Sequence, residues 1–223
     1  ILKYGVPGSL QFTIDILAFT IFIFLIGKIG TTALAISTIV ISINSVAFMP
    51  SMGVSQGISI MVGQALGKGK IDQAKMAFWS STHLLLIYVF IIDLLFLTMP
   101  KPILSLFLQH GSAVEEARYL LDTGSDLLFI VSCYLFLDSF YMVFTGVLKG
   151  AGDNTFLMWS IAALSLTCLI IPCFVGIIYF SQGLYYCWFC ILLFIASLCL
   201  ASAFRYYQGY WKNMLVIEQP EKK

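Results

Sequence analysis

The sequence contains six separate stretches of about 20 or more mostly apolar residues, and this pattern constrains the fold more than any other feature. A helix of that length crosses the hydrocarbon core of a lipid bilayer. The pattern therefore predicts an all-α integral membrane protein, a six-helix transmembrane bundle occupying one domain, residues 1–223. The predicted spans run over about residues 6–26, 33–62, 74–99, 126–148, 156–180 and 184–204.

Composition supports a chain that is solvated by lipid. Of its 223 residues 60% are hydrophobic and 10% are charged, whereas soluble domains carry about 25% charged residues. So few charges could not cover a surface that faces water, so membrane lipid is the expected environment. Basic residues interleaved with aromatic ones, the pattern of a nucleic-acid surface, are missing, and no nucleic-acid partner is expected.

Two segments depart from plain apolar spans. Residues 103–121 mix Glu115, Glu116 and Arg118 with apolar residues, which predicts an amphipathic helix lying at the membrane interface. Pro50 lies within the second span and predicts a kink, which is either a packing feature or a functional bend. The chain begins at Ile1 and enters an apolar span almost at once, so we expect it to be a fragment of a longer protein.

The basic residues predict the orientation of the bundle. Six spans place both chain ends on the same side of the membrane. Loops on the cytoplasmic side of membrane proteins carry an excess of Lys and Arg. Nine basic residues lie on the side of the chain ends and three on the other, so both ends are expected in the cytoplasm, as in a plasma-membrane protein. The nine are Lys3, Lys68, Lys70, Lys75, Lys149, Arg205, Lys212, Lys222 and Lys223, and the three are Lys28, Lys101 and Arg118.

Acidic residues inside apolar spans are the main functional candidates. A charge at the bilayer centre costs about 2.5–3.5 kcal/mol on insertion scales, so such residues usually face a cavity or a partner. Asp15 lies near the middle of the first span with Gln11 one turn earlier, and Asp138 near the middle of the fourth with Tyr134 one turn earlier. These oxygens suit Na+, and burial also favours a protonated carboxyl. The alternative is a carboxylate held by hydroxyl donors that only fixes helix packing.

Asp126 lies near an end of the fourth span and is expected to reach the interface, whereas Asp93 is expected to cap a polar patch or to approach the outer interface. The side chains expected to line a cavity for apolar cations are Gln11, Phe12, Phe19 and Tyr141.

Enzyme and cofactor motifs are missing from the sequence. Cys187 and Cys190 form a C-x-x-C without a second pair of metal ligands, and neither G-x-S-x-G nor H-E-x-x-H occurs. We therefore expect no enzyme, no cofactor and no metal site apart from Na+ at Asp15, Asp138 and Tyr134. Glycines 53, 57, 63 and 67 predict a small-residue face on the second span that lets a neighbouring helix approach closely.

Two glycine-containing motifs resemble signatures of the multidrug and toxic compound extrusion (MATE) family. Residues 54–69, VSQGISIMVGQALGKG, resemble the signature that ends the second helix of each half, and residues 147–155, VLKGAGDNT, resemble the one that ends the fourth. The resemblance implies helices seven to twelve of a twelve-helix transporter of the NorM-like branch. It also implies that Asp15, Asp138 and Tyr134 match the cation-coupling residues, with Asp15 standing where that branch often has Glu.

That resemblance implies a secondary antiporter that exports drugs or organic cations in exchange for Na+ or H+ by alternating access, with a six-helix N-terminal half as its partner. A lipid-linked oligosaccharide flippase of the same superfamily is one alternative, although Lys and Arg are missing at mid-membrane depth. A membrane fragment or subunit that does not itself transport is the other.

Overall fold

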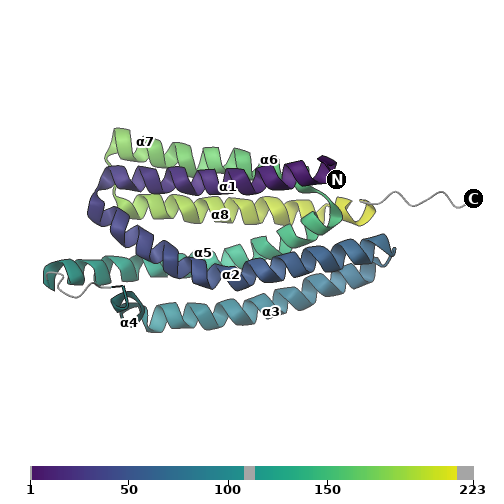
Figure 1. Ribbon diagram of the computed structural model, residues 1–223, viewed down its shortest axis with the longest axis horizontal. Helices are drawn as coiled ribbons and strands as arrows, with labels where there is room; N and C mark the ends of the chain where they lie inside the picture. The colour runs from purple at the N-terminus through teal and green to yellow at the C-terminus, as the bar shows by residue number, and fades with distance from the viewer. Residues whose placement is uncertain (1, 108–113, 215–223) are drawn as a thin grey trace, which may run out of the picture.

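The computed structural model describes residues 2–107 and 114–214, and this part of the chain is helical from end to end apart from short connections (Figure 1). Its helices are α1 (Leu2–Ile29), α2 (Thr31–Gly67), α3 (Ile71–Thr98), α4 (Pro100–Ser105), α5 (Val114–Ala151), α6 (Asn154–Leu164), α7 (Ile171–Phe180) and α8 (Leu184–Tyr207). A π-helical turn, Ser165–Ile170, joins α6 to α7 into one continuous span, and a 3-10 turn, Tyr210–Asn213, follows α8.

Six helical stretches of the described residues are long and apolar enough to cross a membrane, which confirms the predicted fold class. They cover residues 5–29, 31–67, 71–98, 117–151, 154–180 and 184–207. Most of them extend beyond the predicted limits, because the backbone continues its hydrogen-bonded helix past the point at which the side chains stop being apolar. Hydropathy detects only the part of a helix that lipid solvates.

The predicted interfacial helix over residues 103–121 is wrong as a single element. Helix α4 ends at Ser105, and residues 114–121 form the first turns of α5, whereas 108–113 lie outside the described residues. Three charged residues of this region pair with one another. Lys101 Nζ of α4 donates to Asp122 Oδ1 of α5 at 2.9 Å, and Arg118 lies 3.8 Å from the same carboxylate.

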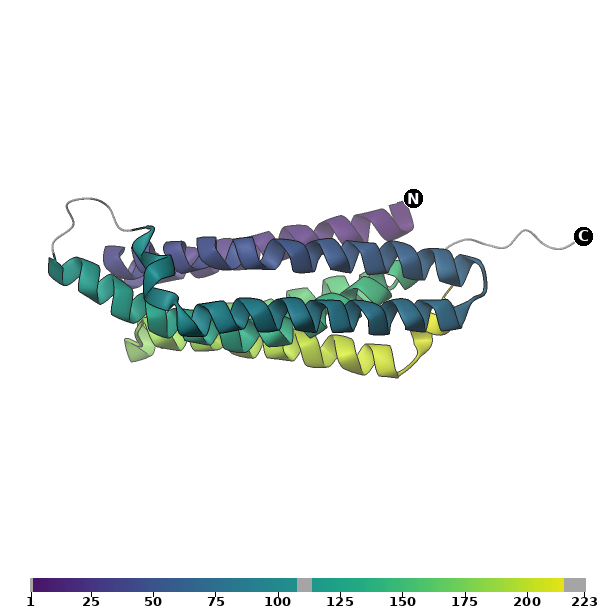
Figure 2. The same cartoon turned by 90° about the horizontal axis from the view of Figure 1, so that it is seen from below.

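Helix α5 forms the centre of the bundle. It packs against α2, α3 and α8, while α1 packs mainly against α6 (Figures 1 and 2). Its inward faces carry fully buried apolar side chains, among them Leu127, Leu128 and Val147. Polar residues on these faces, such as Asp138, are therefore held in the interior by packing on several sides.

The close approach between helices lies on α5 rather than on the predicted face of α2. A Cβ atom at Gly146 or Gly150 of α5 would meet the backbone oxygens of Ser55 or Ser59 in α2 at 2.7 and 2.5 Å. Of the four glycines at which close packing was expected, Gly53, Gly57 and Gly67 have no neighbour within 4 Å among the described residues, and only Gly63 approaches another helix. The sequence identified a small-residue contact involving α2, but of the four predicted glycines only Gly63 takes part in it.

Helix α2 bends near its middle, where Pro50 lies (Figure 1). Proline cannot donate the helical hydrogen bond and so weakens the helix at that level. The Tyr88 hydroxyl of α3 donates to Ala47 O at 2.9 Å, one turn before the proline. A neighbouring helix thus stabilises the backbone of the bend.

The first turns of α1 and the last turns of α8 lie at the same end of the bundle, together with the α2–α3 and α5–α6 connections (Figure 1). An ion pair ties the α5–α6 connection to α8 at this end, because Arg205 Nε donates to Asp153 Oδ2 at 2.7 Å. The Arg205 guanidinium also lies over the rings of Phe156 and Tyr210. Several of the basic residues used to predict orientation therefore cluster at one end: Lys68, Lys70, Lys149, Arg205 and Lys212.

Candidate functional site

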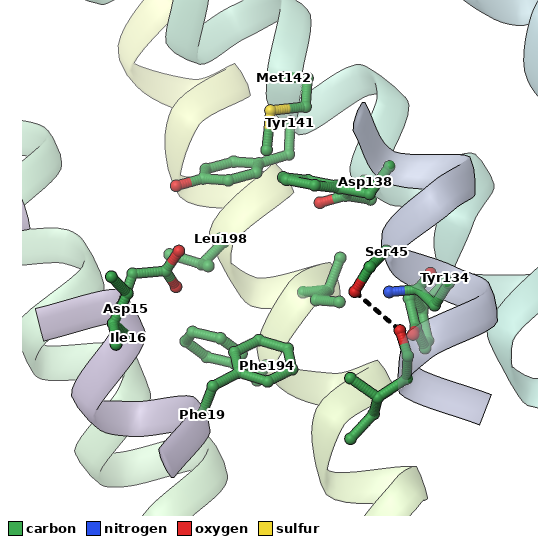
Figure 3. A pocket seen from close by; sticks show the side chains of 14 residues that line it. Asp15, Ile16, Phe19, Ser45, Tyr134, Asp138, Tyr141, Met142, Phe194 and Leu198 are labelled. Atoms are coloured by element: carbon green, nitrogen blue, oxygen red, sulfur yellow. Dashed lines mark hydrogen bonds between the residues drawn. The ribbon is translucent and has the colours of Figure 1, made fainter. Parts of the chain in front are cut away.

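A cavity of about 320 Å³ opens between α1, α2, α5 and α8, and the two mid-span acids face it (Figure 3). Asp15 reaches into it from α1, opposite Asp138 and Tyr134 on α5. The sequence could predict that each acid lies deep in its span, but not that the two share one space. The residues that line this cavity are Asp15, Ile16, Phe19, Ile41, Asn44, Ser45, Phe48, Tyr134, Asp138, Tyr141, Met142, Phe194, Ile195 and Leu198.

The two acids line the same cavity, and no donor among the described residues satisfies them. Asp138 is only 6% exposed, and Asp15 is near enough for the two carboxylates to interact electrostatically. Within residues 2–107 and 114–214, neither carboxylate accepts a hydrogen bond or forms an ion pair within 4.0 Å. An acid that only fixes packing would be held by hydroxyl or amide donors. No such donor among the described residues holds either acid.

Tyr134 and Asp138 project from the same face of α5, one turn apart, as their spacing predicts. The Tyr134 side chain is 3% exposed and lines the same cavity. Asn44 of α2 adds an amide whose Oδ1 atom is buried and without a hydrogen-bond partner among the described residues. Carboxylate, phenol and amide oxygens are ligands that hard cations prefer. The cavity can therefore hold a small monovalent cation between α1, α2 and α5.

Aromatic rings form much of the remaining wall. Phe19 of α1, Phe48 of α2 and Phe194 of α8 line the cavity together with Tyr141 of α5. Faces of aromatic rings attract cations, including organic ones whose charge is spread over a large apolar body. The same space therefore offers an organic cation both a negative charge and apolar contact.

A second, smaller cavity of about 100 Å³ adjoins the first, and the two share Asp15, Phe48, Tyr141 and Met142 as lining residues. Gln11 and Phe12, which were expected to line a substrate cavity, lie here rather than in the larger space. The Tyr141 phenol lies beside Gln11 and Thr145 but does not reach hydrogen-bond geometry with Gln11 Oε1 or Thr145 Oγ1. All seven residues proposed as a site thus line one or the other of two adjoining cavities.

The remaining mid-span acids lie elsewhere. Asp126 is exposed and accepts a hydrogen bond of 2.8 Å from the Tyr185 hydroxyl of α8. Asp93 is half-buried on α3 and faces Ser132 of α5, away from either cavity. Neither is brought to the site.

Sequence reasoning missed several polar residues of the two cavities, among them Asn44 and Lys149. Asn44 is an uncharged polar residue inside an apolar span, and that signal could have identified it. Lys149 was counted among loop residues because it lies near the end of its span, yet its side chain lines the smaller cavity together with Asp15. The direction in which side chains project from a helix could have shown this, because Cα–Cβ bonds tilt toward the helix N-terminus.

Comparison with curated proteins shows relatives that are named as multidrug resistance proteins. The chain is 26% identical over 152 residues to the probable multidrug resistance protein NorM of Brucella suis, covering 68% of this chain and 32% of that protein. The chain is 28% identical over 153 residues to the probable multidrug resistance protein NorM of Agrobacterium fabrum, covering 69% of this chain and 32% of that protein. For the multidrug resistance protein MdtK of Yersinia pseudotuberculosis, identity is 26% over 151 residues, covering 67% and 31%. Alignment with this chain thus spans about a third of each of these relatives.

Solved structures share the fold. An outward-facing multidrug resistance MATE family transporter superposes with a TM-score of 0.82 at 15% identity, covering 96% of this chain and 46% of that one. An inward-facing multidrug resistance MATE family transporter superposes with a TM-score of 0.79 at 17% identity, covering 95% of this chain and 48% of that one. The chain therefore has the fold of about half of such a transporter. The model of the MatE family matches residues 7–175, about three quarters of the sequence, and the chain belongs to the MatE family.

Proposed function

We propose that this chain forms the cation-coupling half of a secondary antiporter that exports drugs or other organic cations in exchange for Na+ or H+. The observation that carries the proposal is the pair of acids, half-buried Asp15 and buried Asp138, which share one cavity and have no donor from the described residues. Uncompensated negative charge in a membrane interior is unfavourable, so the pair is most stable with a bound cation or a proton. A site that must be occupied by one cation or another is the basis of exchange.

Both kinds of occupant fit the cavity. Na+ would bind the oxygens of Asp15, Asp138 and Tyr134, whereas an organic cation would pair with the acids and pack on Phe19 and Tyr141. Because the two compete for the same carboxylates, loading one favours release of the other. Gln11 and Phe12 would extend the substrate surface into the smaller cavity.

Alternating access would come from a second six-helix bundle. The relatives are about three times as long as the aligned region, and the transporter structures are about twice as long as this fold. Those structures include both outward-facing and inward-facing forms. We propose that a complementary N-terminal half closes the open side of the cavity and that rocking of the two bundles exposes it to each side in turn.

The acidic character of the larger cavity favours this function over a lipid-linked oligosaccharide flippase. A flippase must accommodate a pyrophosphate head group, which calls for basic residues, whereas the charged residues of the larger cavity are two aspartates. We further propose a multi-pass protein of the plasma membrane with both ends of the chain in the cytoplasm, supported by the basic residues at the end of the bundle where α1 begins and α8 ends.

The test is ethidium efflux by the two-bundle transporter that contains this chain, measured in proteoliposomes under imposed Na+ and pH gradients. Efflux should respond to at least one of the two gradients, and that response should be lost in Asp15→Asn and in Asp138→Asn. Asp126→Asn is the matched control, because it removes an acid from α5 outside either cavity. If both cavity variants pump like the unaltered protein, the proposed coupling role is wrong.

A further inference from the structure

A lysine shares the smaller cavity with one of the two acids. Lys149 lies in the last turn of α5 and Asp15 on α1, and both line the space of about 100 Å³. The two side chains are near enough to interact electrostatically. A lysine near the end of a membrane helix usually extends its ammonium group to the water interface. Here the side chain is partly buried and lines an interior cavity instead.

Helix direction explains why these two groups converge. Helix α1 begins at the end of the bundle where α5 finishes (Figure 1). Because side chains lean toward the N-terminus of their own helix, Lys149 leans from the end of α5 into the bundle, and Asp15 leans from mid-membrane toward that end. The smaller cavity lies between them, and its lining is suited to an ammonium group. Gln11 Oε1 and Thr145 Oγ1 are buried there and lack hydrogen-bond partners among the described residues.

The charges of the residues that line the two cavities do not cancel and leave a net negative charge. Asp15 and Asp138 supply two negative charges and Lys149 supplies one positive charge. Among residues 2–107 and 114–214, Lys149 forms no ion pair within 4.0 Å, so its ammonium group is not tied to a fixed partner. One monovalent cation or one proton therefore brings the two adjoining cavities to neutrality, whereas two would be needed without the lysine.

We propose that Lys149 is a positioning residue that acts as an internal counter-cation for Asp15, competing with the coupling cation and limiting the site to one monovalent charge. When the site is empty, the Lys149 ammonium moves toward Asp15 and stabilises its carboxylate. When Na+ or an organic cation enters, the ammonium is displaced toward the end of α5. The competition weakens binding enough for the cation to leave again, which an exchanger requires. This inference rests on the proposed cation-coupled function.

The test is equilibrium binding of radioactive Na+ to the purified chain at pH 8. Lys149→Gln should bind Na+ about tenfold more tightly than the unaltered chain, the size expected when a unit charge is removed from the vicinity of a cation inside a protein. Lys149→Met, which keeps the aliphatic part of the side chain, should give the same gain. Lys149→Arg keeps the positive charge and should bind Na+ with the affinity of the unaltered chain. Lys70→Gln is the matched control, because it removes an exposed lysine from the same end of the bundle.

The double variant Asp15→Asn with Lys149→Gln shows whether the lysine acts through Asp15. In the Asp15→Asn background, Lys149→Gln should change Na+ affinity by less than about twofold, because its partner has lost its charge. Equal Na+ binding by the unaltered chain and Lys149→Gln, or absence of Na+ binding in both, overturns the inference. The inference is also overturned if Lys149→Gln raises Na+ affinity as much in the Asp15→Asn background as it does in the unaltered chain. Ethidium efflux that depends on Asp15 and Asp138 would leave the proposed function standing in each of these cases.

Discussion

The contact between α2 and α5 holds the cavity in shape, and Gly150 is its tightest point. An ideal Cβ at Gly150 would lie 2.5 Å from Ser59 O and 3.0 Å from the Val62 side chain. An ordinary van der Waals separation is about 3.5 Å, so Gly150→Ala must move the backbone of α2 or α5 by about 1 Å. The nearest atom is backbone and cannot rotate away. Overpacking of this kind costs about 1–3 kcal/mol.

Replacing glycine by alanine also favours a helix by about 0.5–1 kcal/mol, which partly offsets the clash. Gly57→Ala is the matched control, because Gly57 lies inside α2 and has no neighbour within 4 Å among the described residues. The helix-propensity gain is common to the two variants. Their difference in free energy of unfolding therefore reports the clash alone, and we expect Gly150→Ala to be the less stable by about 1–3 kcal/mol.

Reversible unfolding of the purified chain in mixed detergent micelles, followed by circular dichroism, measures that difference. Na+ binding measured on the same variants should fall with Gly150→Ala, because α2 carries Asn44 and α5 carries Asp138. Equal stability of Gly150→Ala and Gly57→Ala would refute the argument, since it would mean that α2 and α5 are not in backbone contact at this level.

The remaining predictions concern two ion pairs, the Tyr134 phenol and the chain without a complementary bundle. Asp153→Asn removes the charged partner of Arg205, whose Nε lies 2.7 Å from the carboxylate, and should lower the free energy of unfolding by about 2 kcal/mol in the same assay. Asp72→Asn, which breaks the exposed Asp72–Lys75 pair, should change it by less than about 0.5 kcal/mol. Tyr134→Phe should weaken Na+ binding about fivefold while leaving the helical circular dichroism signal unchanged, since it removes one neutral oxygen. The chain alone, in proteoliposomes without a complementary bundle, should not exchange ethidium for Na+ or H+, and robust exchange would show that one bundle suffices.

Much of the fold follows from the sequence because lipid imposes a simple rule. A helix must be long and apolar to cross a bilayer, so the six spans could be predicted from hydropathy alone. Hydropathy did not predict the structure around residues 103–121, because Lys101 and Asp122 form an ion pair there between α4 and α5. Pairing between α4 and α5 depends on how the chain folds back on itself, which the pattern of residue types does not specify.

The candidate site was predictable in its acids but not in its full lining. Asp15 and Asp138 stand out because a carboxylate in an apolar span is unfavourable unless it faces a cavity or a partner. Tyr134 follows from its position one turn before Asp138 on the same face of α5. Phe48 and Phe194 are apolar residues among many others, and only the rotation of α2 and α8 within the bundle places them at the cavity. Lys149 was misjudged because its position along the helix was considered without the direction of its side chain.

Competition between an organic cation and the coupling ion is the most direct test of exchange at the acid pair. Binding of radiolabelled tetraphenylphosphonium to the two-bundle transporter should be measured at rising Na+ concentration and, separately, at falling pH. We expect at least one of these ions to displace the organic cation from the unaltered protein and from Asp126→Asn, and neither to do so from Asp15→Asn or Asp138→Asn. Tetraphenylphosphonium binding to the unaltered protein that is indifferent to both Na+ and pH would contradict cation-coupled exchange at Asp15 and Asp138.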